Sequence, residues 1–124
     1  MPVRGLVYHG RGRPAGVEDL WLDPPQAGEV RVRMLAAGVC HSDLHVVDGE
    51  WERPGGVVLG HEGAGVIETL GEGVEERPQD APLESGGLRV GDLVSLAWTA
   101  PCGACRACTA GQAWLCRDPR GAGH

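Results

Sequence analysis

Four of the five cysteines in this 124-residue chain lie close together near its C-terminal end. They are Cys102, Cys105, Cys108 and Cys116, with the spacing C-x2-C-x2-C-x7-C. Four thiolates on so short a loop can surround one tetrahedral ion, and a site filled by four sulfur atoms has no position left for a substrate. The spacing therefore predicts a structural zinc lobe over residues 98–118.

An iron–sulfur cluster is the main alternative for such a group of cysteines. Its usual spacing has three residues before the last cysteine and a proline after it, whereas here seven residues intervene and Arg117 follows. Four buried free thiols are a second alternative, which a polar, glycine-rich loop does not favour. Zinc is preferred because four clustered thiolates select it. Trp98 and Trp114 flank the lobe and are interpreted as packing for the metal loop.

The charge of the chain excludes several classes of partner. The formal net charge is −6, and all 11 cationic side chains are arginines that form no basic tract. Nucleic acid and anionic membranes are therefore not expected as partners, which argues against a zinc ribbon that binds nucleic acid. We expect a cytoplasmic protein, because no signal peptide or spanning apolar run is visible and clustered cysteines in a reducing compartment more often bind metal.

Short alternating segments predict a mainly β chain with a small core of aliphatic side chains. The first three segments, Val3–Tyr8, Val17–Leu22 and Val30–Leu35, alternate apolar and polar residues and are separated by turn-forming sequences, so we expect an antiparallel meander. The segment VVLGHEGAGVIETLG predicts a strand, a turn and a second strand, since its glycines are too frequent for a helix interior. A further strand is expected in DLVSLAW.

Two segments depart from this β pattern. HSDLHVV favours a short helix that begins near Ser42 or Asp43 as N-cap and ends at Gly49. Residues 72–91 are rich in acids, prolines and glycines and contain little apolar material, so an exposed, mobile loop is predicted there.

A second group of candidate ligands is dispersed along the chain. Cys40 and His61 stand at the ends of separate predicted elements, and open catalytic zinc sites are often assembled in this way. Two ligands are too few for a metal site, however. A lone cysteine after AAGV is also typical of a small buried side chain, and exposed histidines are often only solvated. The residues alone leave both interpretations open.

Three motifs in register carry a family resemblance. The sequence GHEGAGVIETLGEGV fits the pattern G-H-E-x2-G-x5-G-x2-V from Gly60 to Val74, and it is preceded by GVCHSDLH and followed by the four-cysteine lobe. In this order the motifs resemble the N-terminal catalytic domain of the zinc-dependent medium-chain alcohol dehydrogenases. The resemblance covers residues 1–124 and implies a GroES-like, partly open β-barrel with short helices and a projecting four-cysteine zinc lobe.

The resemblance also implies a catalytic centre. Cys40 and His61 would be ligands of a catalytic zinc ion, and Glu62 would be a nearby carboxylate able to tune or transiently join the coordination. Asp43 would accept a hydrogen bond from the other ring nitrogen of His61 and so select its tautomer.

Further roles are implied for residues around this centre. Ser42 would contact the alcohol and pass its proton, through the cofactor ribose, to His45 at the solvent edge. His41 would approach the pyrophosphate of the cofactor. Trp51 would narrow the substrate pocket toward small primary alcohols or aldehydes, although a half-buried packing role explains this residue equally well.

The implied reaction is oxidation of an alcohol to an aldehyde or ketone through a zinc alkoxide, with hydride transfer to NAD or NADP. The expected partners are a small-molecule alcohol or aldehyde and, in the complete enzyme, further copies in a homo-oligomer. The third protein ligand of the catalytic zinc and the Rossmann cofactor domain would lie beyond this sequence, so we expect a truncated chain that is inactive alone. The alternative is a non-enzymatic GroES-like zinc-binding interaction module. The segment 75–89 is longer than the turn usual in the family.

Overall fold

The computed structural model describes residues 1–53, 56–118 and 120–121. Strands dominate it, as predicted: β1 (Pro2–Tyr8), β2 (Gly16–Trp21), β3 (Val30–Gly38), β4 (Val57–Leu59), β5 (Glu62–Leu70), β6 (Leu93–Ser95), β7 (Thr99–Ala100) and β8 (Arg120–Gly121). The helices are short: α1 (His41–Val47), α2 (Arg106–Thr109) and the 3-10 turns η1 (Leu83–Ser85) and η2 (Ala113–Leu115). None of the described helices is long and apolar enough to cross a membrane.

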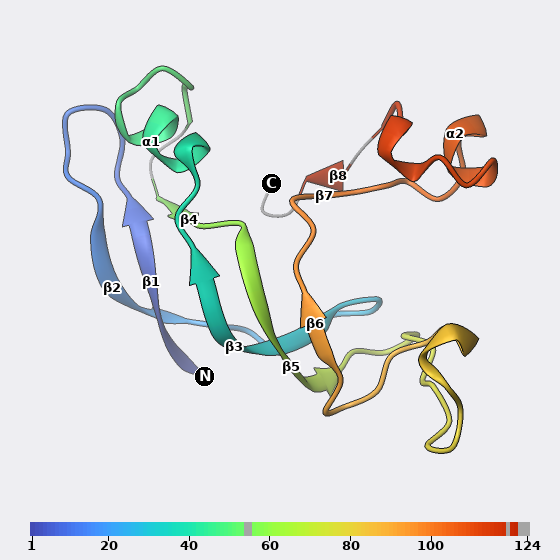
Figure 1. The fold of residues 1–124 in the computed structure, drawn as a ribbon. Helices are drawn as coiled ribbons and strands as arrows, with labels where there is room; N and C mark the ends of the chain where they lie inside the picture. The colour runs from blue at the N-terminus through green and yellow to red at the C-terminus, as the bar shows by residue number, and fades with distance from the viewer. Residues whose placement is uncertain (54–55, 119, 122–124) are drawn as a thin grey trace.

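Two three-stranded antiparallel sheets form the body of the domain. Their strand orders are β2-β1-β4 and β3-β5-β6, and β7 pairs with β8 in a separate two-stranded ladder. Helix α1 lies above the ends of the strands, and the chain that carries α2 projects away from both sheets (Figure 1). Within the described residues the sheets do not close on one another. The expected mainly β architecture, partly open and with a projecting lobe, is thus confirmed.

The expected meander of the first three strands is wrong at its third strand. β2 pairs with β1, but β3 pairs along its whole length with β5, with two register shifts. The connection from β2 to β3 contains Pro24 and Pro25, which donate no backbone hydrogen bond and do not form a tight hairpin. β3 therefore leaves the first sheet and begins the second.

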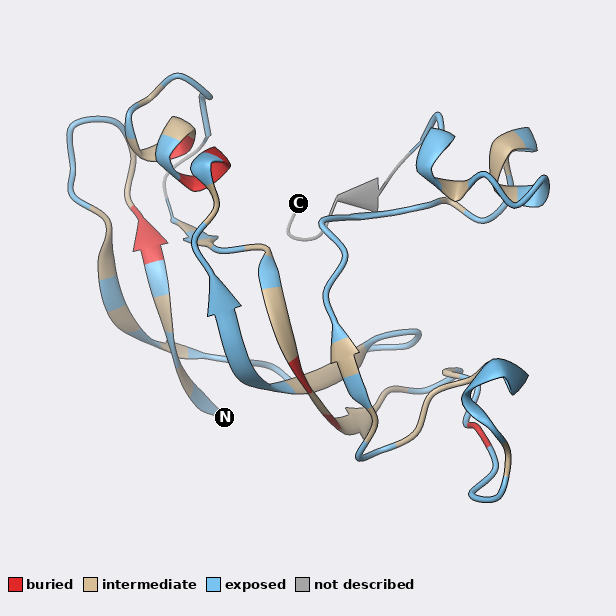
Figure 2. Ribbon diagram, in the orientation of Figure 1, coloured by how far each residue is buried: buried red, intermediate tan, exposed pale blue. Residues whose placement is uncertain are grey.

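The buried core is small, as the composition indicated. Among the described residues the buried apolar side chains are those of Val7, Tyr8, Val46 and Ile67. Most of β3 is exposed. The red buried segments of Figure 2 are confined to short stretches of β1, α1, β5 and residues 72–91, the acidic loop. Polar or charged residues are therefore a notable share of the interior that the structure describes, where Ser42, Asp43 and Arg77 are buried.

The acidic loop after β5 is largely exposed, but it is anchored by contacts that its composition did not reveal. Arg77 is only 4% exposed, and its guanidinium donates hydrogen bonds to the Ala81 carbonyl at 3.0 Å and to the Asp92 carboxylate at 2.5 Å. The backbone of Leu88 bonds to both Glu75 and Arg77. The hydrogen bond from Arg77 lowers the pKa of Asp92. The predicted exposure of this loop is confirmed, and these contacts fix the two ends of the loop against each other.

Gly71, which follows β5, stands where a side chain has no room. Its N–H donates to the Glu29 carbonyl at 2.8 Å, and a Cβ atom would lie 2.0 Å from the Gln26 carbonyl oxygen. We expect Gly71→Ala to lower the free energy of unfolding by about 2–4 kcal/mol, because the backbone must shift. Urea unfolding followed by circular dichroism measures this. Gly16→Ala is the control: its Cβ would meet nothing within 4 Å, so a change within about 1 kcal/mol is expected. Equal losses in both variants would contradict the steric argument.

Candidate metal centre and active site

The first residues of α1 and the turn between β4 and β5 meet at one point. Helix α1 begins at His41 with Cys40 as N-cap, slightly earlier than the predicted caps Ser42 or Asp43. His61 is the second residue of the two-residue turn between β4 and β5, and Glu62 is the first residue of β5. One ligand atom each from Cys40, His61 and Glu62 lies within 4.8 Å of the other two. These dispersed residues are therefore close enough to bind a single metal ion, with positions left over for other ligands.

Asp43 ties together the two segments that carry these side chains. It occupies the third position of α1, where its Oδ2 accepts the Cys40 N–H at 3.1 Å. Its Oδ1 accepts the Gly60 N–H at 3.2 Å and lies 3.6 Å from Nδ1 of His61. The side chain is 11% exposed, so these contacts are sheltered from water. A carboxylate that orients a metal-binding histidine lies beside the ring nitrogen that does not bind the metal, and Asp43 lies beside Nδ1 of His61 in this way.

Ser42 lies on the opposite edge of the His61 ring. Its Oγ is 3.2 Å from Nε2 of His61, and the residue is 8% exposed. The two ring nitrogens of His61 therefore face different residues: Nε2 faces Ser42 and Nδ1 faces Asp43. The structure thus brings the sequence-predicted residues Cys40, Ser42, Asp43 and His61 together.

Aromatic rings extend from this centre to the end of α1. Trp98 stacks on His61, with ring centroids 4.5 Å apart, and on Trp51 at 6.4 Å. Trp51 in turn stacks on His45 at 5.1 Å, and the edge of His41 meets His45 at 4.8 Å. The predicted Trp51, His45 and His41 are therefore neighbours in a single row of rings.

The structure adds to the interpretation of Trp98 and corrects that of Trp114. Trp98 stacks on His61, a contact that the sequence did not indicate, because β6 runs beside β5 and leads the chain past the start of that strand. No local pattern around Trp98 could have indicated this long-range contact. Trp114 is 79% exposed and so does not serve as packing for the metal loop.

The four-cysteine lobe has the geometry of a closed tetrahedral site. The Sγ atoms of Cys102, Cys105, Cys108 and Cys116 all lie within 4.8 Å of one another. The Sγ atom of Cys108 lies 3.5 Å from Sγ of Cys105 and 4.0 Å from Sγ of Cys102. Zinc–sulfur bonds of about 2.3 Å in a tetrahedron place sulfur atoms about 3.8 Å apart, so the cluster fits zinc. Each of the five cysteines of the chain is a free thiol.

Backbone amides prepare part of this cluster to bind a cation. The N–H groups of Cys108 and Arg117 lower the pKa of Cys105 to about 6, so this thiol is largely ionised at neutral pH. Burial, together with the neighbouring Cys105, raises the pKa of Cys108 to about 12. Cys108 therefore keeps its proton at neutral pH until a cation displaces it.

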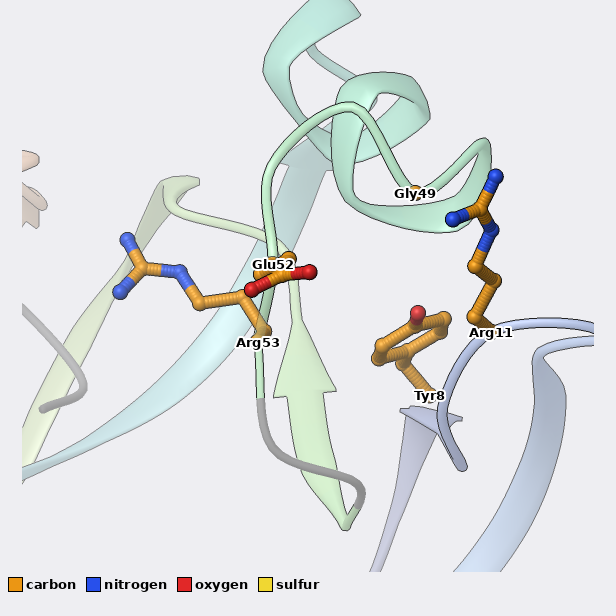
Figure 3. A pocket seen from close by; sticks show the side chains of 5 residues that line it. All are labelled: Tyr8, Arg11, Gly49, Glu52 and Arg53. Atoms are coloured by element: carbon orange, nitrogen blue, oxygen red, sulfur yellow. The ribbon is translucent and has the colours of Figure 1, made fainter.

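A pocket is formed by residues outside these two clusters. It has a volume of about 430 Å³ and is lined by Tyr8, Arg11, Gly49, Glu52 and Arg53 (Figure 3). None of its lining residues belongs to the candidate centre.

The geometry agrees with a known family of domains. A family model described as the alcohol dehydrogenase GroES-like domain matches residues 26–124. The chain belongs to this family. It is 40% identical over 116 residues to an NDMA-dependent alcohol dehydrogenase of Amycolatopsis methanolica, an alignment that covers 94% of this chain and 28% of that protein.

Solved structures of dehydrogenases and reductases are also similar to this chain. An alcohol dehydrogenase zinc-binding domain protein of Burkholderia ambifaria is 37% identical with a TM-score of 0.78, over 94% of this chain and 28% of that one. An acetophenone reductase of Geotrichum candidum, solved in complex with NAD, is 36% identical with a TM-score of 0.69, over 94% of this chain and 32% of that one. The chain thus spans about a third or less of the length of these relatives.

The two ligand clusters predict two classes of metal affinity. We expect one zinc ion held tightly by the four thiolates and a weaker one at Cys40, His61 and Glu62, because only one thiolate contributes there. Zinc titration with chelator competition measures both. Cys40→Ser should abolish only the weak class, whereas Cys105→Ser should abolish the tight class and unfold the lobe. Equal affinities, or less than half an equivalent of bound zinc in the purified chain, would contradict this assignment.

Proposed function

We propose that this chain is the zinc-binding catalytic domain of an NAD(P)-dependent alcohol dehydrogenase that oxidises an alcohol to an aldehyde or ketone. The observation that carries the proposal is the convergence of ligand atoms from Cys40, His61 and Glu62, with the buried hydroxyl of Ser42 beside them. A module that only docks to a partner has no need of a proton-transferring hydroxyl at a metal site. Membership of the alcohol dehydrogenase family supports the same reaction class.

Each residue of the centre has a role in this proposal. When bound, zinc supplies a Lewis acid for the alcohol oxygen and the nicotinamide supplies a hydride acceptor. Cys40 and His61 hold the metal, and Glu62 adjusts its coordination. Asp43 keeps the proton of His61 on Nδ1, so that the lone pair of Nε2, on the side of Ser42, can bind the metal.

Ser42 and His45 move the proton that the alcohol must lose. The Ser42 hydroxyl is buried beside the candidate centre and can accept this proton. His45 lies one helical turn further along α1, where its side chain is 31% exposed, and would receive the proton from Ser42 and release it to solvent. His41, exposed at the first position of α1, is proposed to meet the cofactor pyrophosphate.

A substitution at Ser42 tests this assignment. In the complete enzyme that carries this chain and a cofactor domain, we expect Ser42→Ala to lower kcat for alcohol oxidation about 10²–10⁴-fold, the range for loss of a proton-transferring group. Ser42→Thr retains the hydroxyl and should keep most of the activity. Zinc content, measured in each variant, should not change. An unchanged turnover in the Ser42→Ala variant of the complete enzyme would refute the proposal.

We also expect the 124-residue chain alone not to oxidise ethanol or benzyl alcohol.

We propose that Trp51 and Trp98 form the wall of a narrow substrate pocket. The two indoles stack on each other, and Trp98 lies directly on His61. Both residues are about half exposed, at 41% and 48%, so part of each indole is accessible to a ligand. Two rigid indoles beside the metal leave room for small primary alcohols or aldehydes rather than bulky ones.

Truncation of one indole should therefore broaden the substrate range. We expect Trp51→Ala in the complete enzyme to raise kcat/KM for benzyl alcohol relative to ethanol by about tenfold or more, since pocket contacts change such ratios by 10–200-fold. Trp114→Ala, which removes an exposed indole of the lobe, is the matched control and should leave the ratio unchanged. Unchanged ratios in both variants would show that Trp51 only packs.

We further propose a cytoplasmic location and a homo-oligomeric complete enzyme. The free thiols of the four-cysteine cluster suit a reducing compartment. Apolar side chains such as Val39 and Leu93 are 82% and 72% exposed, which supports additional packing partners in the complete protein.

A further inference from the structure

The turn after α1 holds His45 from three directions. Helix α1 ends at Asp48, and Gly49 adopts a left-handed backbone with φ of 77°, which lets the chain fold back over the helix. The N–H of Trp51 donates to the His45 carbonyl at 3.0 Å and so closes the turn. The indole of Trp51 then covers one face of the His45 ring, and the His41 ring lies against His45 in a T-shaped contact.

Glu50 occupies the remaining position beside this ring. Its Oε2 lies 2.5 Å from Nδ1 of His45. The side chain of Glu50 is 62% exposed, whereas that of His45 is 31% exposed. The pair is therefore half sheltered at the histidine and open to water at the carboxylate.

This contact determines where His45 carries its proton. An ionised carboxylate only accepts hydrogen bonds, so Nδ1 must be the protonated nitrogen when the ring is neutral. Nε2 is then left with a free lone pair and can accept a proton. A neutral histidine in water prefers the opposite tautomer, with the proton on Nε2, and such a ring could not accept a proton at that nitrogen.

We propose that Glu50 is a positioning residue for His45 and the last acceptor for the proton that alcohol oxidation releases; this inference rests on the proposed function. His45 takes up the proton at Nε2 and gives its Nδ1 proton to Glu50, so the ring returns to neutrality. Glu50 passes that proton to water and becomes a carboxylate again. His45 regains the Nδ1 tautomer by exchange with water, and no other reactant is needed.

The tautomer can be measured in the zinc-loaded chain without any catalytic activity. We expect the ¹⁵N chemical shifts of His45, recorded about two pH units above the ordinary histidine pKa, to report a protonated Nδ1 and an unprotonated Nε2. Glu50→Ala should shift the population toward the Nε2-protonated form. Glu52→Ala is the matched control: this carboxylate lies two residues away in the pocket beside Tyr8 and Arg11, and its loss should leave the His45 signals in place (Figure 3).

Two results would overturn the proposal: an Nε2-protonated His45 in the unmodified chain, or the same tautomer in Glu50→Ala. Amide signal dispersion and zinc content verify that each variant is folded. If Glu50→Ala is not folded, Glu50→Ser replaces it.

In the complete enzyme we expect Glu50→Ala to lower kcat about tenfold with little change in KM, and Glu52→Ala to change neither kcat nor KM. An unchanged kcat in Glu50→Ala would refute the acceptor role. Failure of the proposed function would instead appear in Ser42→Ala, which the His45 signals do not depend on.

Discussion

The carboxylate of Asp43 is the interaction on which the candidate centre depends. One oxygen holds the backbone just before α1 and the other holds the backbone of the β4–β5 turn, so two segments distant in the sequence are joined at one buried group. Cys40 and His61 stand on these two segments. Loss of the carboxylate would separate the two ligands and also leave two backbone N–H groups without their partner. The same side chain therefore serves the fold and the metal chemistry.

The pairing of β3 with β5 delivers the ligands to this carboxylate. The last residue of β3, Gly38, is directly opposite Glu62, so Cys40 emerges from the sheet beside the first residue of β5. A Cβ atom at Gly38 would lie 2.4 Å from Oε2 of Glu62. Glycine at this position thus gives the Glu62 carboxylate the space in which it can approach the other two ligands.

The sequence predicted the ligand residues because they lie in short motifs whose spacing is itself chemical information. The four cysteines from Cys102 to Cys116 are spaced so that they can surround one ion within a single loop, and His61 follows a glycine in the turn that leads into β5. Long-range packing was not predictable in this way. The partner of β3, the position of Trp98 over His61 and the burial of Arg77 all depend on chain crossings that leave no local pattern. Glu50 is a similar case, since an acidic residue after a helix is usually only solvated.

The anchored acidic loop has a consequence for how this domain can vary. Glu75, Arg77 and Leu88 pair at its neck, and the Arg77 guanidinium joins that neck to Asp92 just before β6. The path of β5 and β6 is therefore set by the neck and not by the length of chain beyond it. Extra residues between Pro78 and Gly87 add only the slowly growing entropy of a longer loop. This is where the chain could accept an inserted peptide or a second domain while the metal ligands stay in register.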